Sequence, residues 1–293
     1  VSKIEESRRH PYIRPDIPLG KNVYPVVNIA GLEVAAVVFV TPFQNLGQAA
    51  TLVLDEGVAA SFIVSASKGI EKKSLLLAHE IIAESFGEIP FAQISGPSFA
   101  SEVMTGLPTA ITVGTESEEA AFFLNKYLHS KNFRLYSTKD VVGVEIGGAL
   151  KNVIAIAAGI ADGLELGSSA KSALIVRGLA EMSRYGEAYG ANKATFMGLA
   201  GLGDLTLTCS DDQSRNRTFG IRLVSRDRNK DASLDKSELV EGFHTANALA
   251  ESDLISFEEF PLIFEIISIL RNRRSPRESL DRLLSREPKF ETF

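Results

Sequence analysis

The sequence contains very little cysteine. Cys209 is its one thiol in 293 residues, so no intrachain disulfide can form and the core must hold the fold together. The chain also does not open with a basic stretch followed by an apolar signal core. Both observations favour a protein of the reducing cytoplasm, and we predict that location.

Long uninterrupted apolar runs are also absent. Val34–Val40 is too short to cross a bilayer, which takes about 20 apolar residues. The longer run 141–160 is interrupted by glycines and by three polar residues, Glu145, Lys151 and Asn152. We therefore predict that both runs are core elements and that the protein has no membrane partner.

An excess of positive charge is missing too. The formal net charge is −6 and the isoelectric point is near 5.4. Nucleic acids and anionic membranes bind broad cationic faces, which this composition does not supply. The sequence therefore predicts no nucleic-acid partner, and any site for an anion must be local.

The residues that are present suit a large globular protein. At 45% hydrophobic residues the chain can bury a sizeable core, and its length favours two domains. Short apolar runs alternate with helical patterns up to about residue 138. Strands are predicted near 34–40, 61–65, 91–94 and 109–113, and helices near 45–55, 75–85, 98–105 and 117–129.

This alternation predicts a fold of the α/β class. Helical crossovers between strands imply a parallel, doubly wound, Rossmann-like sheet, and the continuous apolarity of 34–40 suits a strand covered on both faces. After Asp140 the pattern turns to long helical stretches at 141–162, 170–189 and 260–271. We expect a dinucleotide-binding domain over 1–138 and an all-helical catalytic domain over 139–293.

The apolar helix around Lys151 is the first candidate site. Its neighbours three and four residues away are Gly147, Gly148, Ile154 and Ala155, so no carboxylate on the same helix can pair with the ammonium group. Burial favours the neutral amine, and a lysine with a lowered pKa can transfer protons near neutral pH. The alternative is a lysine whose side chain reaches the surface.

Asp204 stands in a glycine-rich apolar stretch and is the second candidate. A buried carboxylate is costly unless it is paired, which makes Lys151 its natural partner. The alternative is that Asp204 caps the N-terminus of a helix.

The third candidate is Ser214-Arg215-Asn216, at an apparent helix start. A hydroxyl, a guanidinium and helix-end amides suit a phosphate dianion. The alternative is a solvated turn. Acidic residues at 227–238 have the spacing of a calcium-binding loop, but Ala232 occupies its glycine position. We interpret 225–238 as a surface connection and expect no metal site.

Several ordered segments together resemble the bacterial NAD(P)-dependent glycerol-3-phosphate dehydrogenases. They are SKG at Lys68, ISGPSFA at Gly96, GVEIGGALKNVIAIAAGIADGL at Lys151, RGLAEMSR, GLAGLGDLTLTC at Asp204, SRNRTFG at Arg215, and VEG at Glu241. The resemblance implies reversible reduction of dihydroxyacetone phosphate to sn-glycerol 3-phosphate for glycerophospholipid synthesis. It also implies NAD or NADP as cofactor and a homodimer.

The resemblance also assigns roles to individual residues. It implies that Lys151 is the acid-base group and that Asp204, Thr208 and Lys68 complete the catalytic set. Substrate would contact Lys68, Lys151, Asp204 and the further positions Gly96, Ser98, Ser214, Arg215 and Asn216. The cofactor would contact Lys68, Ala100, Arg215, Leu239 and Glu241.

One family feature is missing from the sequence. There is no G-x-G-x-x-G, the glycine-rich turn between strand and helix that binds the cofactor pyrophosphate. By comparison with the family, Val1 matches a point just after the second strand, so we expect about 40 further residues upstream in the natural protein. Two alternatives remain: a cofactor-free phosphometabolite-binding or inactive homologue, and a related lysine-dependent dehydrogenase for another hydroxy acid.

Overall fold

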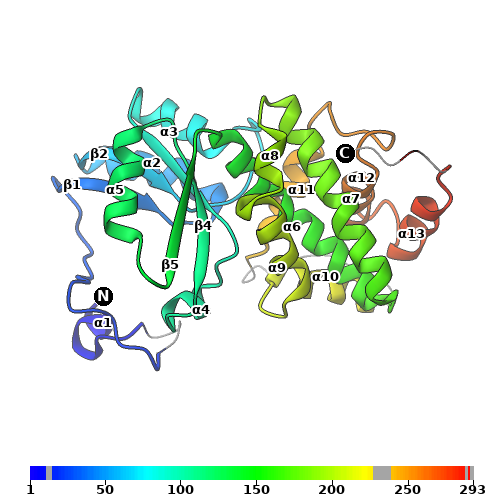
Figure 1. The fold of residues 1–293 in the computed structure, drawn as a ribbon, viewed down its shortest axis with the longest axis horizontal. Coiled ribbons are helices and arrows are strands. Elements are labelled where there is room, and N and C mark those ends of the chain that lie inside the picture. The colour runs from blue at the N-terminus through cyan, green and yellow to red at the C-terminus, as the bar shows by residue number, and fades with distance from the viewer. Residues whose placement is uncertain (11–14, 227–238, 288–289, 291–293) are drawn as a thin grey trace.

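The computed structural model describes residues 1–10, 15–226, 239–287 and 290. They form an α/β domain followed by a helical domain (Figure 1). The elements of the first domain are α1 (Ser2–Ser7), β1 (Glu33–Phe39), η1 (Phe43–Asn45), α2 (Leu46–Asp55), β2 (Ala59–Ser65), α3 (Ala78–Phe86), β3 (Phe91–Ser95), α4 (Ala100–Met104), β4 (Thr109–Gly114), α5 (Glu118–Leu128) and β5 (Phe133–Thr138).

The five strands form one sheet in the order β1-β2-β3-β4-β5. The pairs β1-β2, β2-β3 and β4-β5 are parallel, which confirms the predicted fold class. The pair β3-β4 is antiparallel, with Ile94 opposite Val113, so the sheet is not parallel throughout as we expected. An antiparallel neighbour needs no helical crossover, and the five-residue α4 provides none.

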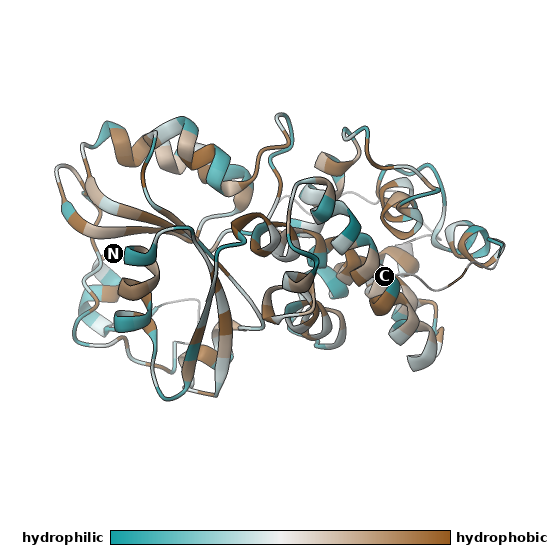
Figure 2. Ribbon diagram, turned by 45° about the horizontal axis from the view of Figure 1, so that its top comes forward, coloured by the Kyte–Doolittle hydropathy of each residue, from teal (hydrophilic) through white to brown (hydrophobic). Residues whose placement is uncertain are grey.

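Helices cover the two faces of the sheet unequally. α2 and α3 pack on one face around Phe39, Ile63 and Ile82, and α5 packs on the other around Phe62 and Ile111. Figure 2 shows the hydrophobic residues of the strands in brown. The expectation that β1 is covered on both faces is wrong: Val38 is 51% exposed, because β1 is an edge strand and α5 packs on the strands further along the sheet.

The helical domain is built around one long helix, α6 (Val141–Gly163), which is almost wholly buried. By length and hydropathy α6 could cross a membrane, but here it is enclosed by other helices, as expected of a core element. The remaining elements are α7 (Gly167–Ala188), α8 (Lys193–Phe196), η2 (Leu199–Gly203), α9 (Asp204–Ser210), α10 (Arg215–Arg226), α11 (Glu241–Leu249), α12 (Pro261–Leu270) and α13 (Pro276–Leu284).

α6 and α10 cross in backbone contact at Gly159 and Gly220. A Cβ atom on Gly159 would lie 2.0 Å from the carbonyl oxygen of Arg217, and one on Gly220 would lie 2.1 Å from that of Ile156. Only glycine permits this approach. The crossing brings the N-terminus of α10 close to the middle of α6, where Asn216 donates to Asn152 Oδ1 at 2.9 Å.

The predicted surface connection at 225–238 falls mostly outside the described residues. α10 continues to Arg226, and the positions with calcium-loop spacing, 227–238, are not described.

Candidate active site

Two lysines from different domains meet one carboxylate. Lys151 Nζ on α6 donates to Asp204 Oδ1 at 2.5 Å, and Lys68 Nζ, from the loop after β2, donates to Asp204 Oδ2 at 2.6 Å. Lys151 Nζ also donates to Thr208 Oγ1 at 3.0 Å, and Thr208 in turn donates to the Asp204 carbonyl oxygen at 2.6 Å. The contact predicted between Lys151 and Asp204 is confirmed.

The alternative interpretations of both residues are wrong. The Lys151 side chain is 10% exposed, so it does not reach the surface. Asp204 is the first residue of α9, whose N-cap is Gly203, and its carboxylate binds the two ammonium groups instead of capping the helix. From sequence, a helix cap is the more common interpretation of such an aspartate, because a cap is a local contact. The two lysines are distant in sequence, 53 and 136 residues away.

Burial and charge set the protonation of this group. Burial lowers the pKa of Lys151, the neighbouring Lys68 ammonium lowers it further, and Asp204 raises it, which leaves it at about 8. Burial alone would raise the pKa of Asp204, but the two ammonium groups hold it below its usual value. Lys151 is therefore a proton donor and acceptor that changes state close to neutral pH.

Close backbone packing brings Asp204 to α6. The preceding segment η2 is one turn of π-helix, and its Ala200 carbonyl oxygen would lie 2.6 Å from a Cβ atom on Gly147 of α6. A π-helical turn inside a helical region is often found at functional sites. The glycine that permits this approach is therefore Gly147 of α6, and it does not belong to the glycine-rich stretch around Asp204 that the sequence indicated.

The segment after β3 forms one wall of the site. The Gly96 carbonyl oxygen lies 3.5 Å from Lys68 Nζ and accepts from Ser98 Oγ at 3.1 Å. Gly96 has φ of 142°, and a Cβ atom there would lie 2.9 Å from Ile111 Cα, so no other residue fits. Ala100 follows as the first residue of α4. Gly96 and Ser98 therefore lie beside Lys68.

Ser214-Arg215-Asn216 does form a helix start, as predicted. Ser214 precedes α10, is buried, and accepts from the Arg217 amide at 3.2 Å. Arg215, the first residue of α10, is exposed. Ser101 of α4 donates to Gln213, which joins this segment to the wall after β3.

Asn216 is placed differently from its neighbours. It is buried, its amide nitrogen donates to Asn152, and its Oδ1 accepts from the Gly242 amide at 2.9 Å. Its side chain therefore connects α6, α10 and α11, and the second hydrogen of its amide nitrogen remains as a donor for a ligand. Sequence reasoning missed Asn152, although an amide next to Lys151 in an apolar helix was a signal that a buried polar partner exists.

Glu241 contacts the segment just after β1 from the helical side. Leu239 is half-buried, and Glu241 begins α11. Glu241 Oε1 accepts from the Phe43 amide at 3.0 Å, just after β1, while Oε2 is buried with no partner among the residues that the structure describes. Burial raises the pKa of Glu241, although the Phe43 amide and the Arg215 charge lower it. A buried acceptor with no protein partner is what a bound ligand with an N–H donor would satisfy.

Two family models match the chain. Residues 1–121 match the NAD-dependent glycerol-3-phosphate dehydrogenase N-terminus, and residues 140–281 match the C-terminus of the same family. The two matches correspond to the α/β domain and the helical domain.

Comparison with individual proteins points to the same family as the two family models. The chain is 40% identical to a glycerol-3-phosphate dehydrogenase [NAD(P)+] of Stenotrophomonas maltophilia, over 99% of this chain and 86% of that protein. It is 45% identical to the enzyme of the same description from Methylobacillus flagellatus, over 79% and 70%. The crystal structure of a Coxiella burnetii glycerol-3-phosphate dehydrogenase superposes with a TM-score of 0.85 at 35% identity, covering 97% of this chain and 88% of that one. The chain therefore belongs to the NAD(P)-dependent glycerol-3-phosphate dehydrogenase family, a family of oxidoreductases.

Proposed function

We propose that this protein interconverts dihydroxyacetone phosphate and sn-glycerol 3-phosphate with NAD or NADP, with Lys151 as the acid-base group, and that its product supports glycerophospholipid synthesis. The observation that carries the proposal is the Lys151 ammonium group, buried and held by Asp204 and Thr208 beside Lys68. A carbonyl reduction needs such a proton donor where the oxygen becomes negative.

The cofactor fits the residues at the edge between the domains. Glu241 Oε2 is a buried acceptor with no partner among the described residues, and an amide donor of the nicotinamide would satisfy it. We propose that Lys68, Ala100, Arg215, Leu239 and Glu241 hold this end of the cofactor. When bound, the reduced nicotinamide supplies the hydride for the carbonyl carbon.

The chain's own residues manage the proton. Lys151 donates a proton from Nζ to the ketone oxygen as negative charge develops there, and it takes the proton back from the alcohol in the reverse direction. Asp204 and Thr208 hold Nζ in one position. Lys68 places a second positive charge beside the oxygen. Preorganised charges of this kind stabilise the transition state in a site that excludes water.

The start of α10 suits the phosphate group. Arg215 is exposed there, while the buried Ser214 and Asn216 shape the end of the helix. We propose that Arg215, Ser214 and the remaining amide hydrogen of Asn216 contact the phosphate portion, and that Gly96 and Ser98 contact the carbon chain. A guanidinium beside helix-end amides binds a phosphate dianion better than it binds a neutral group.

Turnover is the direct test. Purified protein, mixed with dihydroxyacetone phosphate and NADH or NADPH, is expected to oxidise one cofactor or both, followed by loss of nicotinamide absorbance. Replacing the substrate with a 2-keto acid is expected to give no oxidation, because such an acid has no phosphate group for the proposed site at Arg215. Binding of substrate without oxidation would favour the cofactor-free alternative, and oxidation with the keto acid would favour the hydroxy-acid dehydrogenase.

The two directions are expected to depend on pH in opposite ways. Because the pKa of Lys151 is lowered to about 8, the ammonium form needed for ketone reduction is lost as pH rises through about 8. The neutral form needed for alcohol oxidation is gained over the same range. Measured as kcat/KM, reduction should fall and oxidation should rise around that pH. Identical profiles in both directions would contradict the assignment of Lys151.

The boundary between the domains, the oligomeric state and the location are further proposals. We propose domains at 1–138 and 139–293, because β5 ends at Thr138 and α6 begins at Val141. The family resemblance supports a homodimer. The single buried Cys209 is compatible with the cytoplasm, and a small phosphorylated metabolite is the expected partner.

A further inference from the structure

We propose that Glu145 is a positioning residue that fixes Lys68 relative to Lys151 by anchoring the start of α3 to α6. This proposal rests on the proposed function only in naming the reaction whose rate Glu145 affects. Glu145 touches neither lysine, so its action must pass through the backbone that carries Lys68.

The carboxylate of Glu145 joins the two domains. It lies on α6 of the helical domain and is 4% exposed. Its Oε1 accepts from the backbone amide of His79 at 2.8 Å, and its Oε2 lies 2.6 Å from His79 Nδ1. His79 is the second residue of α3, where a helix has amides without a partner inside the helix. Glu145 therefore caps α3 from another element.

α3 is the end of the segment that carries Lys68. Residues 66–77 run from the end of β2 to α3 and carry Lys68. The residues beside Lys68 are also held locally, because Ser67 Oγ donates to the Thr41 carbonyl oxygen at 2.7 Å and Gln44 donates to the Ile70 carbonyl oxygen at 2.8 Å. The other support is Gly148, one turn further along α6. A Cβ atom there would lie 3.3 Å from Lys68 Cδ and 2.9 Å from Ser95 Oγ. Glu145 and Gly148, three residues apart, share one face of α6. The helix that carries Lys151 thus lies against the Lys68 side chain at Gly148 and binds the far end of the Lys68 segment through Glu145.

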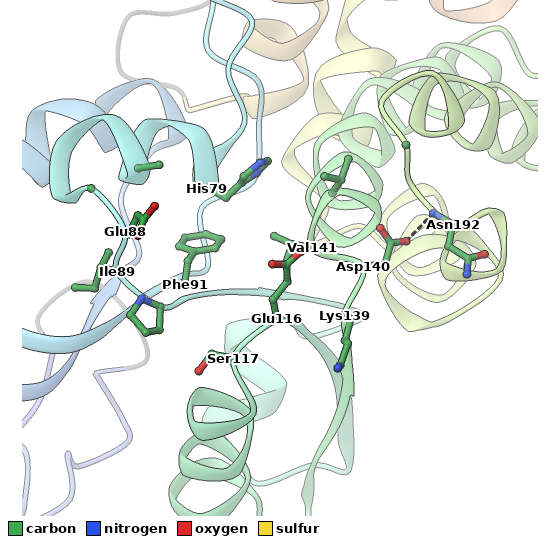
Figure 3. Close-up of a pocket in the computed structure, with 15 residues that line it drawn as sticks. His79, Glu88, Ile89, Phe91, Glu116, Ser117, Lys139, Asp140, Val141 and Asn192 are labelled. Carbon is green, nitrogen blue, oxygen red and sulfur yellow. Dashed lines mark hydrogen bonds between the residues drawn. The ribbon is translucent and has the colours of Figure 1, made fainter.

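The contact between Glu145 and His79 lies beside a cavity whose lining does not include Lys68 or Lys151. A cavity of about 800 Å³ lies between α3, the start of β3 and the start of α6, and His79 lines it with Glu116, Lys139 and Asp140 (Figure 3). Burial raises the pKa of Glu145, and His79 lowers it. Burial lowers the pKa of His79, but Glu145, Glu80 and Glu116 raise it. Among the described residues, His79 is the group whose hydrogen bond and charge lower the pKa of the buried carboxylate.

Two substitutions separate the effect of the side-chain length of Glu145 from the effect of its charge. Glu145→Asp keeps the charge but shortens the side chain, so it cannot reach the His79 amide from α6. Glu145→Gln keeps the length and an acceptor oxygen for that amide but has no charge. If Glu145 acts by position, Glu145→Gln should resemble the unchanged protein and Glu145→Asp should not.

The pKa of Lys151 reports where Lys68 lies, because the Lys68 ammonium group lowers it. In Glu145→Asp we expect kcat to fall roughly tenfold to a hundredfold. We also expect the pKa of Lys151 to rise by about one pH unit as Lys68 moves away. The titration is followed in the free protein by NMR of lysine labelled at Cε, with Lys151→Met used to assign the signal, and by the pH profile of kcat/KM.

The outcomes are distinct. The proposal is overturned if folded Glu145→Asp keeps the kcat and the Lys151 titration of the unchanged protein, or if Glu145→Gln shifts the titration as far as Glu145→Asp does. Should thermal unfolding show that Glu145→Asp does not fold, a shifted Lys151 titration in Glu145→Gln would still overturn the proposal. The NMR titration can be measured without turnover. If the unchanged protein were inactive but Lys151 titrated as expected, the proposed function would be contradicted. The effect of Glu145 on the Lys151 titration could still be measured.

Discussion

We expect the Lys151→Met variant to lose roughly 10²–10⁴-fold in kcat, the usual contribution of a general acid or base. Methionine fills a similar space in the apolar surroundings of α6 but has no proton to give. Asp204 keeps Lys68 as its partner at 2.6 Å, so the carboxylate is not left buried without a cation. The variant should therefore fold and bind ligands while failing in the chemical step.

Steady-state and single-turnover oxidation of the reduced cofactor measure this effect. A matched control is Lys139→Met, because Lys139 is an exposed lysine whose nearest carboxylate, Glu118, is 3.8 Å away. The control should keep full activity. An undiminished kcat in Lys151→Met would overturn the assignment of the acid-base group, and a loss of thermal stability larger than that of the control would show that the loss of rate has another cause.

The Asp204→Asn variant is expected to have the second large effect, on both rate and stability. Removing the carboxylate leaves two ammonium groups facing each other in a buried site. Burial and the Lys68 charge then lower the pKa of Lys151 below about 8 without the opposing effect of Asp204. Reduction should slow at neutral pH because less ammonium is present. Since breaking a buried ion pair is costly, the free energy of unfolding should fall by roughly 3 kcal/mol.

The pH profile of kcat/KM and denaturant unfolding measure the two effects. The exposed Asp55, at the end of α2, offers a control substitution to asparagine that should change neither quantity. The shift is opposite in direction to that expected for Glu145→Asp, in which Lys68 moves away and the pKa of Lys151 rises. A profile unchanged in Asp204→Asn would mean that the carboxylate does not control the lysine.

Local sequence patterns predicted most of the fold. Apolar runs bounded by turn residues located β1 to β4, and the long helix α6 was clear from its composition. β5 was missed because only Leu135 is buried in it, so its residues show no apolar run. The antiparallel direction of β4 could not be predicted either, since strand direction depends on how the chain between β3 and β4 folds back in space.

Part of the site was also predicted from local sequence patterns. The sequence indicated that Lys151 needed a partner from elsewhere and named Asp204, and the structure places them 2.5 Å apart. It could not show that Lys68 binds the other oxygen of that carboxylate, or that Asn216 turns inward to Asn152. These contacts join residues 64 to 136 positions apart, and only the packing of several elements brings them together.

The contact between Gly159 and Gly220 has a consequence for the size of the molecule that the protein can accept. α6 carries Lys151, the start of α10 carries Arg215, and the two helices meet backbone to backbone, so no side-chain rotation can change their separation. Under the proposed assignment of Lys151 to the ketone and Arg215 to the phosphate, the backbone therefore fixes how far apart the two helices lie. Only the side chains of these two residues could adapt to a longer or shorter substrate.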